Sequence, residues 1–136
     1  LFTKLRDEQG LGYSVTSFLW QTPVAGFLAF YIGTSPDKAD QSLEGFKAVI
    51  KELRETPLDR ADIERGQNTL EGDYYREHQS LASRSREAAV LQTQGLPLDR
   101  NRALITTSKE LTAEDLQHLA ATYLLWDEAY LLKVTP

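Results

Sequence analysis

Apolar and polar residues alternate along an early stretch of the chain, and a second stretch is almost wholly apolar. Residues 12–20 alternate, and the alternation places Tyr13 on the same face as Val15 and Leu19. This pattern predicts a strand with one buried face. Residues 24–33 are rich in aromatic rings and predict a buried central strand. The break between the two is short, so we expect an antiparallel hairpin.

After the second strand, the apolar residues are spaced as in a helix. Ser35 is placed as an N-cap, and Pro36 stands at the first helical position. Apolar residues then recur at intervals of three and four, which predicts one amphipathic helix that ends before Pro57. Its apolar face consists of Ala39, Leu43, Phe46, Ile50 and Leu53.

Helices are predicted for most of the remaining chain, and residues 129–134 predict a last strand. Gly66 and Gly72 lie inside one of these helices, where a missing side chain would permit close packing of the backbone. Residues 1–9 predict the end of a helix that Gly10 closes. Further helices are predicted from Asp59 onward, at residues 80–94, at residues 99–108 and from residue 112 onward.

This order of elements predicts an α+β fold. Strands that follow each other closely pair in an antiparallel sheet, and a run of helices covers one face of it. We therefore expect a two-layer arrangement, with a mostly antiparallel sheet and helices packed on one face. The 136 residues are enough for one domain with a single core.

Composition narrows the function classes. The net charge is −5, from 15 basic and 20 acidic residues, which argues against a nucleic-acid surface. The absence of cysteine excludes a disulfide scaffold, a thiolate metal site and a cysteine nucleophile. No apolar run reaches the ~18 residues of a membrane span. The chain contains no methionine and begins with Leu1, so we expect a fragment whose true start lies upstream.

Several segments resemble, in order, the metallopeptidase family of pitrilysin, insulysin and mitochondrial processing peptidase. Residues 1–15, LFTKLRDEQGLGYSV, resemble the family segment "LF..LRE..GLAYSV". The resemblance continues through FYIGTSPDK at 30–38 ("GT.PEK"), DIERGQN at 62–68 ("ELE.AKN"), Gly95, LTAEDL at 111–116 ("VTAEDV") and ATYL at 121–124 ("A..YL"). It implies that residues 1–136 are the second part of a domain of this family.

Family members bind zinc through a His-x-x-Glu-His motif and a distant glutamate. The chain has only His78 and His118, and neither lies in such a motif. We expect His78 at a junction between helices and His118 on the polar side of the helix that starts at Thr112, and we read both as solvent-facing or helix-surface residues. The resemblance therefore implies the metal-free domain, with no metal here and zinc in a partner domain or subunit. It also implies a peptide substrate. Because bacterial relatives are often periplasmic, the periplasm is favoured over the cytoplasm.

The resemblance also indicates two residues that act on substrate. In the family, an arginine and a tyrosine near the opening segment reach from the metal-free half and hold the substrate carbonyl oxygen. Arg6 and Tyr13 stand at the matching positions. A guanidinium and a phenol are suitable donors for the charge that develops on that oxygen. Without the resemblance, Arg6 is a surface residue that pairs with Asp7 or Glu8, and Tyr13 is a half-buried strand residue.

Three functions remain open. The first is the metal-free domain of a zinc-dependent endopeptidase, which encloses and positions peptide but is not catalytic alone. The second is a scaffold or interaction subunit of the same family, in which Arg6 and Tyr13 have no substrate. The third is an unrelated α+β binding module. Residues 24–33 are a core strand in the simplest interpretation, although an extended peptide could add to such a strand.

Overall fold

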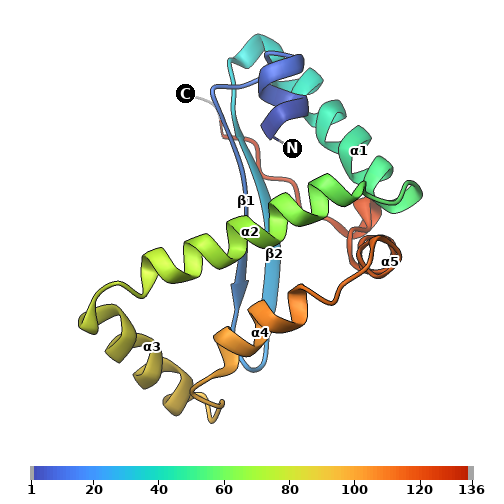
Figure 1. Cartoon of the computed structure of the whole chain (residues 1–136). Helices are drawn as coiled ribbons and strands as arrows, with labels where there is room; N and C mark the ends of the chain where they lie inside the picture. The colour runs from blue at the N-terminus through green and yellow to red at the C-terminus, as the bar shows by residue number, and fades with distance from the viewer. Residues whose placement is uncertain (1, 135–136) are drawn as a thin grey trace. The chain divides into compact units, whose positions relative to one another are not determined.

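The computed structural model describes residues 2–134 and separates into two compact units (Figure 1). Unit 1 comprises Leu1–Thr56 and Gln117–Pro136, and unit 2 comprises Pro57–Leu116. The division falls inside helix α5 (Ala113–Tyr123). Helices and an antiparallel hairpin make up the regular structure, so the α+β class predicted from the sequence is confirmed.

Unit 1 begins with a short π-type helix, η1 (Phe2–Glu8), that a left-handed glycine ends. Gly10 has a φ of 60°, which costs a residue without Cβ little. The Leu11 amide donates to the Leu5 carbonyl at 2.9 Å, and both leucine side chains are fully buried. The predicted helix end and its glycine cap are confirmed, and Leu1 lies outside the described residues.

The predicted hairpin is present as β1 (Ser14–Gln21) and β2 (Gly26–Gly33). The two strands pair along their whole length in antiparallel register, from Ser14 opposite Gly33 to Gln21 opposite Gly26. The Thr22 amide closes the connecting turn by donating to the Ala25 carbonyl at 2.7 Å.

β2 is not the buried central strand that its composition suggests. Its first residues are exposed, and only Gly33 at its end is buried. The prediction failed because an apolar run shows what a strand can bury but not what covers it. Within residues 2–134 the sheet has two strands, and the predicted strand at 129–134 is also wrong, since those residues form no ladder and are exposed.

After β2, a turn of 3₁₀-helix, η2 (Pro36–Lys38), leads into α1 (Ala39–Glu55). Ser35 has the extended conformation of an N-cap and Pro36 follows it, as predicted, although the Ser35 side chain makes no capping hydrogen bond to the backbone. The helix ends before Pro57, also as predicted. Its buried residues are Ser42, Gly45, Phe46, Val49 and Ile50.

The core of unit 1 lies between α1, η1 and one face of the hairpin. Val15 from β1 and Phe46 from α1 are buried there, and Phe30 from β2 packs on Phe46 with ring centroids 6.2 Å apart. Gly45 lets η1 approach α1, because a Cβ at that position would stand 2.7 Å from Cδ2 of Leu5. Each such apolar side chain contributes roughly 1.5–3 kcal/mol through its burial.

The last part of the chain returns to α1. Within η3 (Trp126–Glu128), Trp126 packs on the core, and the Lys47 ammonium lies 5.4 Å from the centre of its ring. Farther along, Lys133 pairs with Asp40 at 3.2 Å.

Unit 2 consists of α2 (Arg60–Glu77), α3 (Leu81–Thr93), α4 (Arg100–Ser108) and the start of α5. The predicted caps are confirmed: Asp59 accepts from the Asp62 amide at 2.7 Å, and Thr112 and Asp115 form a reciprocal pair. Gly95, with a φ of 68°, closes α3.

The glycines of α2 do not serve the close packing that we expected of them. No atom lies within 4 Å of a Cβ built at Gly66 or Gly72. Contacts between α2 and the segment after α4 are made instead by long side chains. Gln67 donates to the Ser108 carbonyl at 2.8 Å, and Lys109 pairs with Glu71 at 2.8 Å.

Over the described residues, no helix combines the length and apolar character that crossing a membrane requires.

Candidate functional site

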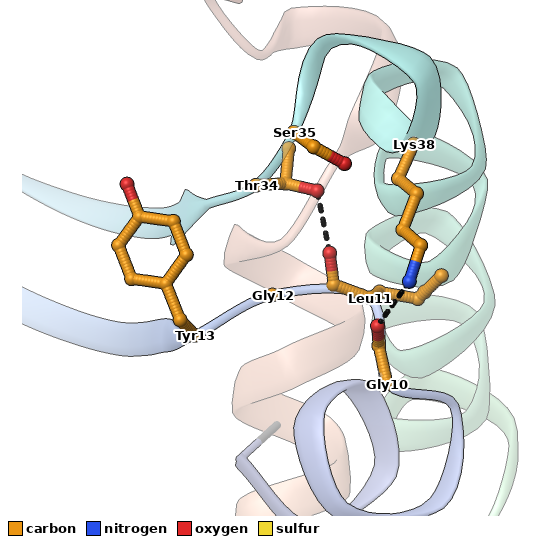
Figure 2. Close-up of a pocket in the computed structure, with 7 residues that line it drawn as sticks. All are labelled: Gly10, Leu11, Gly12, Tyr13, Thr34, Ser35 and Lys38. Carbon is orange, nitrogen blue, oxygen red and sulfur yellow. Dashed lines mark hydrogen bonds between the residues drawn. The ribbon is translucent and has the colours of Figure 1, made fainter.

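The segment between η1 and β1 is fastened by side chains from the stretch that joins β2 to α1. The Thr34 hydroxyl donates to the Leu11 carbonyl at 2.5 Å, and the Lys38 ammonium donates to the Gly10 carbonyl at 3.0 Å (Figure 2). The buried Ser42 hydroxyl lies 3.3 Å from the Thr34 oxygen. Hydrogen bonds to charged or part-buried groups each contribute about 1–2 kcal/mol. This turn is therefore a fixed element rather than a loose connection.

Two glycines let the turn and the end of β2 approach each other. A Cβ at Gly12 would stand 2.7 Å from the Gly33 carbonyl oxygen and 2.6 Å from the Ile32 side chain. A Cβ at Gly33 would stand 2.9 Å from Cε2 of the Tyr13 ring. Real Cβ atoms do not approach other atoms this closely, so both positions exclude larger residues without movement.

A hydrogen bond fixes the backbone of Tyr13, while its ring is exposed to solvent. Its amide donates to the Gly33 carbonyl at 3.0 Å, while its side chain remains 75% exposed. Figure 2 shows the ring reaching from its own strand toward the strand that leads to Thr34. The sequence-based assignment of Tyr13 to the face of Val15 is wrong, because Tyr13 precedes the ladder and its ring lies on the side of the Gly33 Cβ position.

A shallow depression lies beside Tyr13. It has a volume of about 350 Å³ and belongs wholly to unit 1 (Figure 2). The only charged side chain that lines it, Lys38, already binds a carbonyl. Its lining residues are Gly10, Leu11, Gly12, Tyr13, Thr34, Ser35 and Lys38.

Arg6 stands in the last turn of η1, on the other side of Gly10 from Tyr13. Its side chain is exposed, and its carbonyl accepts from the Gly10 amide at 2.9 Å. A cation in the last turn also suits the negative end of a helix. Arg6 does not line the depression that Tyr13 borders. The fold thus places Arg6 on η1 and Tyr13 just before β1, on either side of one fastened turn.

Unit 2 contains a polar cluster that the sequence did not indicate. His78, the C-cap of α2, donates to the Tyr74 carbonyl at 2.6 Å, and its other ring nitrogen lies 2.5 Å from the Glu87 carboxylate. The rings of Tyr74 and His78 stack at 4.0 Å. Asn101 donates to the second Glu87 oxygen at 2.5 Å.

The neighbours of His78 raise its pKa. The Tyr74 carbonyl has the largest effect, and partial burial opposes it, while the hydrogen bond and the charge of Glu87 act in the same direction as Tyr74. A neutral imidazole has one N–H, whereas two acceptors face this ring, so the protonated form is favoured. His78 lies at the junction of α2 and α3, as predicted, but the expectation that it faces solvent is wrong, since its side chain is only 16% exposed. His118 is exposed, as predicted.

The donors of the described residues do not form a zinc site. No group of three histidine, cysteine, aspartate or glutamate side chains converges anywhere in residues 2–134, whereas a zinc site in a protein uses three or four such ligands. His78 and Glu87 make up a pair, and the hydrogen bonds just described occupy their polar atoms.

Comparison with known proteins assigns the chain to a family. The model of the peptidase M16 inactive domain matches residues 1–70, just over half of the chain, which includes η1, the hairpin and α1. The chain is also similar to the "non-peptidase homolog YmxG" of Helicobacter pylori (strain ATCC 700392 / 26695), with 24% identity over 116 residues. That similarity covers 85% of this chain and 27% of the relative, so the chain spans about a quarter of the relative's length. The chain belongs to the family of M16 peptidase inactive domains.

Proposed function

We propose that residues 1–136 are the later part of the metal-free domain of a zinc-dependent endopeptidase, and that this domain helps to enclose and position peptide substrate. The family match supports this proposal, since it covers the segment with Arg6 and Tyr13. In the complete domain, the hairpin belongs to a larger, mostly antiparallel sheet in a two-layer arrangement. The packing of α1 on a single face of the hairpin agrees with that arrangement.

Tyr13 and Arg6 would act as donors to the substrate carbonyl oxygen. Hydrolysis of a peptide bond places negative charge on this oxygen, and donors that are already oriented stabilise that charge without reorganising. The observation that carries the proposal is the geometry of Tyr13, whose backbone is fixed by Gly33 while its phenol stays exposed. Arg6 would add a positive charge from the neighbouring helix end.

The chain would not hydrolyse peptides by itself. No group of three potential zinc ligands converges among its described residues, so the metal would be held by another domain or subunit of the same peptidase. The substrate oxygen would then be held between that partner and the turn at Gly10.

A scaffold subunit is the second candidate. The printed name of the Helicobacter pylori relative, a non-peptidase homolog, favours it. In a scaffold, Tyr13 and Arg6 would have no substrate, and the fastened turn would serve only the packing of η1 on α1. The two candidates differ in a single measurable property: whether the intact protein, assembled with a zinc-bearing partner, cleaves unfolded peptides.

The decisive experiment compares two tyrosines of equal exposure. Tyr13 and Tyr123 are both 75% exposed, so Tyr123→Phe controls for loss of a surface hydroxyl. In the assembled peptidase, Tyr13→Phe should lower kcat about 100-fold with little change in KM, because a donor to the oxyanion acts in the transition state. Arg6→Ala should lower kcat in the same way, whereas Ala at the exposed Arg84 should not.

An unchanged kcat in Tyr13→Phe would refute the oxyanion role. If the assembled wild-type protein cleaves no member of a library of unfolded peptides, the scaffold function replaces the peptidase function.

A further inference from the structure

The carboxylate of Glu87 joins three helices of unit 2. Glu87 is the middle residue of α3, and its two oxygens have partners on different helices. One oxygen lies 2.5 Å from Nε2 of His78 at the end of α2, and the other accepts from the side-chain amide of Asn101 in α4 at 2.5 Å. The side chains of His78 and Glu87 are mostly buried, with 16% and 19% exposed. We call Glu87, His78 and Asn101 the Glu87 latch.

Apolar packing alone holds α3 weakly. Leu91 is the buried residue of this helix, and its other side chains are exposed or half-buried. On the helices around it, α2 buries no residue and α4 buries Ile105. A helix of 13 residues is marginal in water unless it packs on something else. The polar contacts of Glu87 therefore contribute a large share of what keeps α3 docked.

The protonation state of His78 decides whether its contact with Glu87 is attractive. Nδ1 of the ring donates to the backbone carbonyl of Tyr74 at 2.6 Å, and a neutral imidazole has only one N–H. If Nδ1 keeps that hydrogen, the lone pair of Nε2 faces a carboxylate oxygen at 2.5 Å. A protonated ring donates to both acceptors. Loss of the proton thus turns an attractive contact into a repulsive one.

The groups around the ring favour the protonated, attractive state. The Tyr74 carbonyl raises the pKa of His78 most, partial burial lowers it, and Glu87 and the charge of Glu77 raise it. The Tyr74 ring also stacks on the imidazole at 4.0 Å. On α4, the Arg100 guanidinium donates to the side-chain oxygen of the latch asparagine at 3.4 Å. The net direction is a raised pKa, so the attractive contact persists up to a higher pH than the pKa of an isolated histidine would allow.

We infer that the Glu87 latch is a pH-sensitive device, which holds α3 against α2 and α4 while His78 is protonated and releases α3 when the imidazole becomes neutral. The inference is independent of the proposed function, because the latch lies in unit 2 and none of its residues lines the depression beside Tyr13. Release exposes Leu91 to water. The core of unit 1 contains no residue of α3, so α1 and the hairpin stay folded.

Hydrogen exchange of the intact protein, followed by mass spectrometry at about pH 5.5 and 8.5, tests the latch. These values lie on either side of the ordinary histidine pKa of about 6.5 and of a moderately raised one. Observed exchange rates are divided by those of the unfolded chain at the same pH, which removes the chemical pH dependence of exchange. The resulting protection factors report how often each helix opens.

Protection of α3 should fall at least about tenfold from the lower to the higher pH, because loss of a hydrogen bond between charged groups changes an equilibrium by that factor or more. The closed latch favours the proton, so protection is greatest below the ordinary pKa and is lost as pH rises. The opening should also be local. At both pH values, α3 should be less protected than α1, and low urea concentrations should hardly change its exchange.

Glu87→Gln should close the latch without a proton. The glutamine keeps the shape of the side chain, its amide can donate to the neutral Nε2 of His78, and its oxygen can accept from Asn101. In this variant, protection of α3 should not fall between the two pH values. Glu110→Gln is the matched control: it removes the same charge at an exposed position after α4, so the tenfold fall should remain.

Three results would overturn the inference. The first is equal protection of α3 at both pH values in the unchanged protein. The second is a fall that persists in Glu87→Gln. The third is exchange of α3 and α1 with the same protection and the same dependence on urea, which would show that the chain opens as a whole. Protection of α1 in each variant confirms that the fold is intact.

Discussion

The ring of Tyr13 lies over Gly33, with Cε2 only 2.9 Å from the point where a β-carbon on residue 33 would stand. The same glycine accepts the Tyr13 amide at 3.0 Å, so its carbonyl fixes the backbone of Tyr13 while its missing side chain leaves room for the ring. Gly33, the first residue of the GTSPDK segment at 33–38, thus determines the direction of the phenol that the proposed function requires.

Gly33→Ala should displace the Tyr13 ring at little cost in stability. The atoms in the way belong to the far end of an exposed side chain, which can rotate, so the free energy of unfolding should change by less than about 1 kcal/mol. Turnover of the assembled peptidase should fall as it does in Tyr13→Phe. In a double-mutant cycle the two changes should not add, because both remove the same donor. Additive losses in kcat would show that Gly33 acts independently of Tyr13.

Thr34→Val should loosen the turn that presents Tyr13. The variant keeps the shape of the side chain and removes the closer of two hydroxyl donors to the Leu11 carbonyl, which leaves only the Ser42 hydroxyl at 3.5 Å. The free energy of unfolding in urea should therefore fall by about 1–2 kcal/mol. Thr16→Val is the control. Thr16 is exposed on β1, and its hydroxyl makes only a 3.4 Å contact with the next carbonyl, so stability should not change. Equal effects of the two variants would show that the turn does not depend on Thr34.

Local signals in the sequence predicted the elements but not their surroundings. The hairpin, the α1 start at Ser35 and Pro36, and the capping pair of Thr112 and Asp115 all follow from contacts within a few residues, and all are present. The burial of β2 and the strand at 129–134 depend on what packs against them, which periodicity does not encode. Both predictions failed for that reason.

In the candidate site, too, local features could be predicted and their surroundings could not. The positions of Arg6 and Tyr13 around Gly10 could be predicted, whereas the face of Tyr13 could not. Alternation holds only inside the ladder, and the ladder begins at Ser14. The pairing of His78 with Glu87 joins the end of α2 to the middle of α3, and no local pattern indicates a contact between these two residues, which are nine positions apart.

Glycine-to-alanine changes should have opposite effects in α1 and α2. Gly66→Ala should stabilise the protein by about 1 kcal/mol, because alanine is the better helix former and nothing lies near the new methyl group. Gly45→Ala gains the same propensity, but its methyl group would meet the fully buried Leu5 side chain at 2.7 Å, so a net loss of about 1–2 kcal/mol is expected. Thermal unfolding of each variant, compared with that of the unchanged protein, shows whether the substitution raises or lowers the stability. A stabilised Gly45→Ala would mean that η1 does not pack closely on α1.

The stability of the protein should fall above neutral pH because of His78. Its pKa is raised in the fold, first by the Tyr74 carbonyl and then, against partial burial, by Glu87 and by the charge of Glu77. A raised pKa means that folding favours the protonated ring. The resulting contribution to the free energy of unfolding is complete below the ordinary histidine pKa of about 6.5 and is lost as pH rises through the higher pKa of the folded state.

Urea unfolding at about pH 5.5 and 8.5, a range in which ordinary carboxylates stay ionised, should therefore show greater stability at the lower pH. His78→Gln should reduce this difference, and His118→Gln, at an exposed position, should leave it unchanged. If the difference persists in His78→Gln, the cluster with Tyr74, Glu87 and Asn101 does not couple folding to protonation.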